Sequence, residues 1–198
     1  MRVLIPVVIA VAALVGCTSL GPQEARRHYV LESGGGARSA AVARATTLLV
    51  APTTAPGFYE TPDIVYSRVP GQRAHYQFHA WTERPGRRFA ELLVARLEGS
   101  GSFSAVVSAT SGVRGDVILG THLAEFYHDA STAPGSVRVV VTAELTDPQR
   151  RALLARRIFE RLAPAPTHDA PGAVQAFGIA VTGILDDLAA WVDASAPR

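Results

Sequence analysis

The sequence predicts an α+β domain in which a largely antiparallel sheet carries two amphipathic helices packed on one face. Two stretches of the chain have apolar residues at helical spacing. Several other stretches alternate apolar and polar residues, or form short β-branched runs that end in turn residues. All of these apolar faces are buried together when both helices cover the same face of one sheet.

Four strands are predicted before the first helix, at residues 29–31, 46–50, 64–66 and 74–78. The second is a β-branched and leucine run that ends at Pro52. The third and fourth flank residues 69–72, whose central Pro-Gly pair is typical of a tight turn. These two strands are therefore expected to form a hairpin.

Both helices are predicted from apolar stripes. After Pro85, apolar residues recur at helical spacing and Gly99 lies past the last of them, which predicts a helix of about 13 residues. A second stripe extends over residues 174–192. Its length is close to the roughly 20 residues that cross a bilayer. Asp186, Asp187 and Gln175 argue against a span, so this helix is expected to pack on the sheet.

Strands are also predicted at residues 103–107, 116–129 and 137–145, the last with a clear period of two. Residues 147–150 carry the signal of a type I turn. Residues 153–162 are in conflict, because their arginines, leucines and alanines favour a helix. Their place after a strand and a tight turn favours an antiparallel return strand, which is the prediction made here. Residues 163–172 are predicted to form a loop.

The N-terminus resembles a bacterial lipoprotein signal. The apolar run of residues 3–15 is too short to cross a bilayer and ends in Leu-Val-Gly-Cys, a lipobox. We therefore expect a signal peptide at residues 1–16, acylation of Cys17, a lipidated tether at 17–27 and a periplasmic domain at 28–198. Thr18, where an aspartate would favour the inner membrane, favours the outer membrane. Acyl chains on Cys17 would anchor the domain stably.

Composition excludes several classes of protein. Every one of the 19 basic residues is an arginine, and without lysine there is no P-loop and no Schiff-base nucleophile. The net charge of +2 does not indicate a nucleic-acid partner. Cys17 is the only cysteine, so the chain has neither an internal disulfide nor a cysteine metal cluster.

No set of residues predicts catalysis or metal binding. His75 and His79 have a spacing that binds metal on a helix, but on the predicted strand they stand about 13 Å apart. His122 and His128 are further apart on their strand. Glu83, His168 and Asp169 lie in predicted loops, and no nucleophile is paired with them. Asp186 and Asp187 are neighbours on a predicted helix, so their carboxylates point in different directions. We therefore predict no enzyme, no metal and no cofactor other than the lipid on Cys17.

One constellation is more specific. Aromatic, proline and glycine residues occur behind the lipobox in an order that resembles the PqiC-like ABC-type transport auxiliary lipoproteins, over residues 29–191. The residues that carry the resemblance are Pro56, Gly57, Phe58, Val65, Tyr66, Trp81 and Pro85. Ser67 departs from it, because relatives often carry arginine there, and this weakens the inference of a charged contact.

The resemblance implies a periplasm-facing outer-membrane lipoprotein of an MCE-type lipid transport system. Its partners would be an MCE-domain protein and, through it, a separate ABC permease and ATPase; phospholipid binding and a homo-oligomer are left open. Phe58, Tyr59, Tyr66 and Trp81 are candidate docking residues if exposed. The alternative for each is a core or turn role.

Two alternative functions remain from the sequence. A lipid-binding periplasmic carrier would need an apolar cavity open to solvent. A structural or assembly lipoprotein of the outer membrane would, like a docking subunit, present a partner-facing surface without such a cavity.

Overall fold

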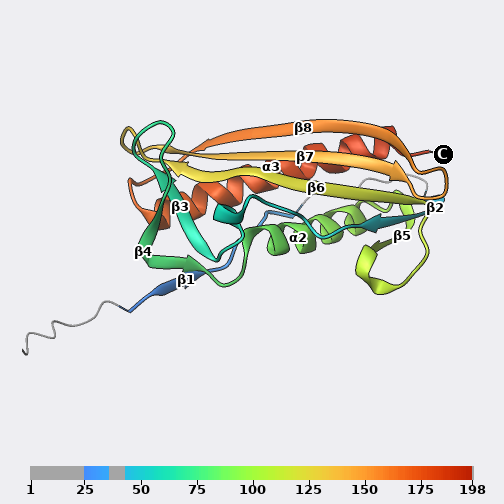
Figure 1. Cartoon of the computed structure of the whole chain (residues 1–198), viewed down its shortest axis with the longest axis horizontal. Coiled ribbons are helices and arrows are strands. Elements are labelled where there is room, and N and C mark those ends of the chain that lie inside the picture. The colour runs from blue at the N-terminus through green and yellow to red at the C-terminus, as the bar shows by residue number, and fades with distance from the viewer. Residues whose placement is uncertain (1–24, 36–42, 198) are drawn as a thin grey trace, which may run out of the picture.

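The centre of the fold is one eight-stranded sheet, and both helices pack against it (Figure 1). The computed structural model describes residues 25–35 and 43–197. Cys17 and the expected signal peptide lie outside these residues. The elements, in chain order, are β1 (Arg27–Tyr29), β2 (Arg44–Val50), η1 (Gly57–Tyr59), β3 (Asp63–Ser67), β4 (Ala74–Trp81), α2 (Pro85–Ser100), β5 (Phe103–Ser108), η2 (Ala109–Ser111), β6 (Val117–Asp129), β7 (Ser136–Asp147), β8 (Ala152–Pro164) and α3 (Ala170–Ser195).

The sheet is mixed, and its longest pairings are antiparallel. β6, β7 and β8 form a three-stranded antiparallel meander along their whole lengths. β3 and β4 form the expected antiparallel hairpin. β2 and β3 pair with the two ends of β6 in parallel, and β1 and β5 are added in parallel at the margins. The α+β prediction is confirmed, with these short parallel pairings as an addition.

Side-chain alternation decides which face of the sheet meets the helices. On β7, the residues with odd numbers from Val137 to Leu145 are fully buried, while their neighbours are only partly covered. α3 packs over β7 and β8, and α2 packs over β5 and β6 and against α3. The predicted period of two therefore marks the face that is buried by the helices (Figure 1).

α3 is, within the described residues, the one helix long and apolar enough to cross a membrane by length and composition. A buried core helix meets the same criteria. Here α3 lies against two strands and α2, and it buries twelve of its residues, among them Phe177, Ile184 and Leu188. The structure thus agrees with the prediction of a helix that packs on the sheet.

Several boundaries differ from the predictions. β1 begins at Arg27, within the expected tether, and ends at Tyr29 rather than Leu31. α2 continues through Gly99 because the left-handed residue that ends it is Gly101, with φ of 67°. The segment 153–162, whose composition favours a helix, is the strand β8, as predicted. The predicted loop at 163–172 is shorter, since β8 reaches Pro164 and α3 starts at Ala170.

Candidate interaction site

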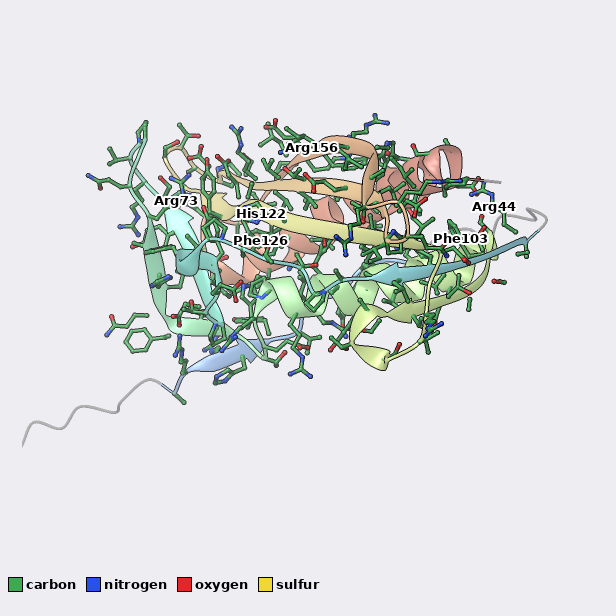
Figure 2. The ribbon with its side chains drawn as sticks, turned by 45° about the vertical axis from the view of Figure 1, so that its right-hand side comes forward. Arg44, Arg73, Phe103, His122, Phe126 and Arg156 are labelled. Carbon is green, nitrogen blue, oxygen red and sulfur yellow. The ribbon has the colours of Figure 1, made fainter. Side chains whose placement is uncertain are left out.

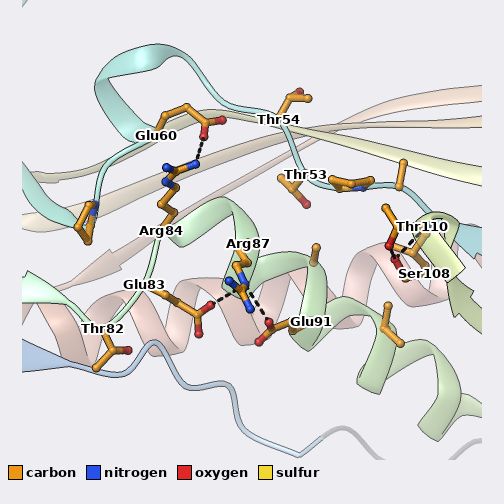
Figure 3. Close-up of a pocket in the computed structure, with 16 residues that line it drawn as sticks. Thr53, Thr54, Glu60, Thr82, Glu83, Arg84, Arg87, Glu91, Ser108 and Thr110 are labelled. Atoms are coloured by element: carbon orange, nitrogen blue, oxygen red, sulfur yellow. Dashed lines mark hydrogen bonds and ion pairs between the residues drawn. The ribbon is translucent and has the colours of Figure 1, made fainter.

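An open groove of about 1020 Å³ lies between the N-terminal half of α2 and the loop that leads from β2 to β3 (Figure 3). Gly86 allows α2 to lie close to this loop, because a Cβ at position 86 would stand only 3.2 Å from the Thr53 carbonyl oxygen. The apolar part of the lining comes from Val50, Ala51, Pro52, Pro62, Ala90 and Val94. The hydroxyl groups come from Thr53, Thr54, Thr82, Ser108 and Thr110.

The charged groups of the groove are paired with one another. Arg84 reaches Glu60 across the groove at 4.0 Å, and Arg87 lies 3.3 Å from Glu83 and 3.4 Å from Glu91 (Figure 3). These ion pairs are solvent-exposed and contribute little to folding stability. Replacing these ion pairs by contacts with a polar partner costs little free energy. The groove is therefore suited to a polypeptide surface rather than to an acyl chain.

Phe58 is an exposed aromatic residue two positions before Glu60, which lines this groove. It lies on η1, in the loop that also supplies Glu60, and 42% of its surface is exposed. Its ring stacks on His75 of β4 with a centroid distance of 4.3 Å. The following residue, Tyr59, is buried, and Arg73 donates a hydrogen bond of 3.3 Å to its hydroxyl. The loop therefore holds Phe58 outward, because Tyr59 is buried and the Phe58 ring stacks on His75.

The other aromatic candidates have structural roles. Trp81 is 2% exposed, and its ring lies 6.0 Å from Phe126 and 5.5 Å from Phe177. Tyr66 is half-buried and packs on Tyr76 at 4.6 Å. Trp81 and Tyr59 are buried and so lack the exposure that a docking role requires, and the alternative core role fits them. Only Phe58 among the four is exposed.

The two histidines of β4 do not face a common site. His75 and His79 both lie on β4, as predicted, and their rings face different neighbours: Phe58 for His75 and Tyr29 for His79. The Tyr29 hydroxyl is 3.0 Å from Nδ1 of His79. In the described part of the chain, no three His, Cys, Asp or Glu side chains are grouped so that they could hold a metal ion.

His128 forms a buried polar contact that no local pattern of the sequence predicts. The Tyr76 hydroxyl lies 2.8 Å from Nδ1 of His128, and the Pro134 carbonyl oxygen lies 3.3 Å from Nε2. The carbonyl can only accept, so Nε2 carries the proton and Nδ1 accepts from Tyr76. Burial lowers the pKa of His128, and burial also raises the pKa of Tyr76 to about 12. Both groups are neutral at pH 7 and serve packing.

A β-bulge explains why His128 is buried while His122 on the same strand is exposed. The pairing of β6 with β7 shifts by one residue between Leu123 and Glu125. This shift moves the following side chains to the opposite face of the sheet. Even spacing in the sequence predicts the same face for both histidines, so only the bulge separates them.

The other candidate residues are also placed by the fold. Asp186 pairs with Arg96 of α2, and Asp187 pairs with Arg161 of β8, so the two carboxylates diverge as predicted. His168 lies in the loop before α3. Ser67 is buried and donates a hydrogen bond to the Val69 carbonyl oxygen at 2.9 Å.

Comparison with known families gives one match over most of the chain. A model of the family described as ABC-type transport auxiliary lipoprotein component matches residues 29–189. This range contains Phe58, the groove, α2 and most of α3. Comparison with curated proteins gives no match.

Solved structures share the fold. A DUF330 protein from Xanthomonas campestris superposes with a TM-score of 0.79 at 21% identity, covering 85% of this chain and 96% of that one. An uncharacterized protein gives a TM-score of 0.68 at 15% identity, covering 85% of this chain and 99% of that one. A hypothetical protein from Chlamydia trachomatis gives 0.54 at 10% identity, covering 77% and 98% respectively. At these identities the likeness is one of fold.

Proposed function

Because the chain belongs to the family of ABC-type transport auxiliary lipoprotein components, we propose that it is the docking subunit of an MCE-type lipid transport system. In this proposal, acyl chains on Cys17 hold the domain at the outer membrane, facing the periplasm. Its direct partner is an MCE-domain protein, and the ABC permease and ATPase are separate chains that act through this partner. The family is one of transport auxiliary components rather than of enzymes.

The observation that carries the proposal is the exposure of Phe58 on an anchored loop. An aromatic ring that is held in place before binding contributes apolar area to an interface at a small entropic cost. Two contacts fix the loop: Tyr59 is buried, and the ring of Phe58 stacks on His75. Phe58 also belongs to the Pro-Gly-Phe stretch through which the sequence resembles the auxiliary lipoproteins.

The groove next to Phe58 supports a polypeptide partner. Its exposed ion pairs, such as Arg84 with Glu60, provide donors and acceptors beside apolar lining residues such as Pro52 and Val94. An aromatic anchor beside a polar rim is the usual composition of a protein–protein interface. A partner that covers both features would contact the loop at residues 56–62 and the start of α2.

The packing between the helices and the sheet favours docking over lipid carriage. Trp81, Phe126 and Phe177 fill this space, and the rings of Phe126 and Phe177 stack at 4.2 Å. A carrier would need to open this aromatic cluster to admit an acyl chain. Besides its apolar residues, the groove is lined by paired charges and hydroxyl groups, and an acyl chain in the groove would separate these polar groups from water.

The test is capture of the MCE-domain partner by the full chain from detergent-solubilised membranes. We expect Phe58→Ala to lower the recovered partner at least tenfold, as for a central aromatic anchor. Val113→Ala is the matched control, since Val113 is 49% exposed and lies in a different loop. This control should retain full capture, and both variants should unfold at the same temperature as the original chain.

Two results would contradict the proposal. One is capture of the MCE-domain protein that is equal for Phe58→Ala and for the original chain. The other is a purified original chain that binds stoichiometric phospholipid and captures no MCE-domain protein, which would support the carrier instead.

A further inference from the structure

β8 is a long strand at an open edge of the sheet. It has 13 residues and pairs with β7 along one side. No described strand pairs with its other side, and in Figure 1 it runs along the upper margin of the molecule. Backbone N–H and C=O groups on such an edge can pair with another strand.

This edge is also where exposed apolar side chains concentrate. Four of the nine large apolar side chains that are exposed in the described residues lie on β8. Ile158 is 63% exposed and Leu162 is 62% exposed. The other two are Leu153 and Leu154. An apolar strand edge of this kind is typical of a surface that another strand covers.

On the outward face of β8, residues of opposite charge stand at equal distances before and after Ile158. Arg156 stands two positions before Ile158 and Glu160 two positions after it. Residues separated by two positions share a face of the sheet.

Antiparallel pairing of two copies with Ile158 on the twofold axis makes use of this symmetry. Arg156 of each copy then lies opposite the partner's Glu160, and this ion pair forms twice. The two Ile158 side chains meet at the centre. A twofold axis at Arg156 would instead place the two Arg156 side chains opposite each other, and an axis at Glu160 would do the same with the two Glu160 side chains. Charge complementarity therefore selects one register.

The geometry of β8 allows this register. The shift in its pairing with β7 lies between Leu145 and Thr146, which are opposite Ala155 and Leu153. From Ala155 onward the ladder with β7 is regular, so the seven residues centred on Ile158 form a regular edge. Figure 2 shows Arg156 on this outer part of the molecule.

We propose that two copies of this chain pair through β8 as an antiparallel twofold dimer, with one sheet continuous across both copies. The occupant of the β8 edge is the β8 of a second copy. This inference rests on the edge and its charges and is independent of the role in transport.

The first test is cross-linking of the full chain in its membrane. Directly opposite residues of an antiparallel pair have Cβ atoms about 4.5–5.5 Å apart, so Ile158→Cys should be joined by a short bismaleimide to a species of twice the mass. Val113→Cys, at a position that is 49% exposed but lies away from β8, should give no such species. The unaltered chain, whose only cysteine is Cys17, measures the background.

Charge reversal in the Ile158→Cys chain then tests the register. Arg156→Glu and Glu160→Arg each place like charges opposite at two points and should lower the cross-linked yield about tenfold. The double variant exchanges the two charges and should restore the yield to within about twofold of the parent.

Contacts within one chain cannot produce this rescue. Arg156 pairs with Glu144 at 3.3 Å and Glu160 pairs with Arg138 at 3.2 Å in the same chain. Both of these pairs stay repulsive in the double variant, so recovery reports only the contact between copies. The proposal is overturned by a yield from Ile158→Cys no higher than from Val113→Cys, by a double variant as weak as the single ones, or by cross-linking of Ile158→Cys to a different protein.

Discussion

At the scale of single residues, His128 is a buried side chain whose surroundings change its protonation. Its ring is fully buried between the Tyr76 hydroxyl and the Pro134 carbonyl oxygen. Burial opposes the charged imidazolium, and this is the main reason that the pKa of His128 is lowered. The folded chain therefore resists a protonation that the unfolded chain accepts.

This difference predicts a loss of stability in acid. Between the lowered pKa of His128 and the ordinary value of about 6.5, the unfolded chain binds more protons than the folded one, so the free energy of unfolding falls as the pH falls. The contribution is fully present above pH 6.5 or so and is lost through the folded pKa. Denaturant unfolding at pH 7.5 and 5.0 measures it.

His128→Gln keeps a hydrogen-bonding side chain and removes the titration, so its stability should change less between the two pH values. The exposed His122 provides the control: His122→Gln should keep the original pH dependence. An unchanged pH dependence in His128→Gln would show that other groups cause the acid sensitivity.

At the scale of elements, α3 depends on how its first turn is closed. The Asp169 side chain accepts a hydrogen bond from the Gly172 N–H at 2.9 Å and caps the helix. The Thr167 hydroxyl donates to the same carboxylate oxygen at 2.6 Å. The hydrogen bond from Thr167 is the largest cause of the lowered pKa of Asp169. The cap therefore fixes the residue at which α3 begins.

Asp169→Ala removes this cap and should lower the free energy of unfolding by about 1 kcal/mol, as for other N-cap deletions. Chemical denaturation at pH 7 measures the change. Glu98→Ala, which removes an exposed carboxylate from α2, should change stability by less than about 0.5 kcal/mol. Equal effects of the two substitutions would argue against a capping role.

At the scale of the whole molecule, α3 is tied to three other elements through its carboxylates. Asp186 pairs with Arg96 of α2, Asp187 with Arg161 of β8, and Asp193 with Arg44 of β2. Together with the apolar core, these pairs join the helices and the sheet into one unit that presents Phe58 and the groove. In the proposed function, position in the envelope is then decided by the lipid on Cys17.

Cys17→Ala should therefore separate folding from location. Each buried CH₂ of an acyl chain contributes about 0.8 kcal/mol to membrane binding, and the variant has none of these chains. We expect it to leave the outer-membrane fraction and to fail to restore envelope integrity in a deletion strain, while its unfolding temperature stays the same. Full complementation by Cys17→Ala would show that the anchor is dispensable.

Local patterns were enough to predict most elements of this fold. The period of two on β7 and the stripes of α2 and α3 depend on which residues are apolar, and burial follows directly from that property. The strand at β8 was predicted from its place after a turn, against helix propensity; pairing along the length of β7 stabilises it. The family resemblance was confirmed over residues 29–189.

The site depended on the tertiary structure. Phe58, Tyr59 and Trp81 are equally aromatic in the sequence, but only the packing of neighbouring elements leaves Phe58 exposed and the other two buried. The bulge in β6, which buries His128, and the edge that exposes Ile158 likewise arise from pairing between distant segments. The sequence by itself determined most of the helices and strands, with β8 as the exception, because apolar periodicity is local. Which side chains remain available to a partner was decided only by the tertiary structure, because exposure depends on contacts between residues far apart in the chain.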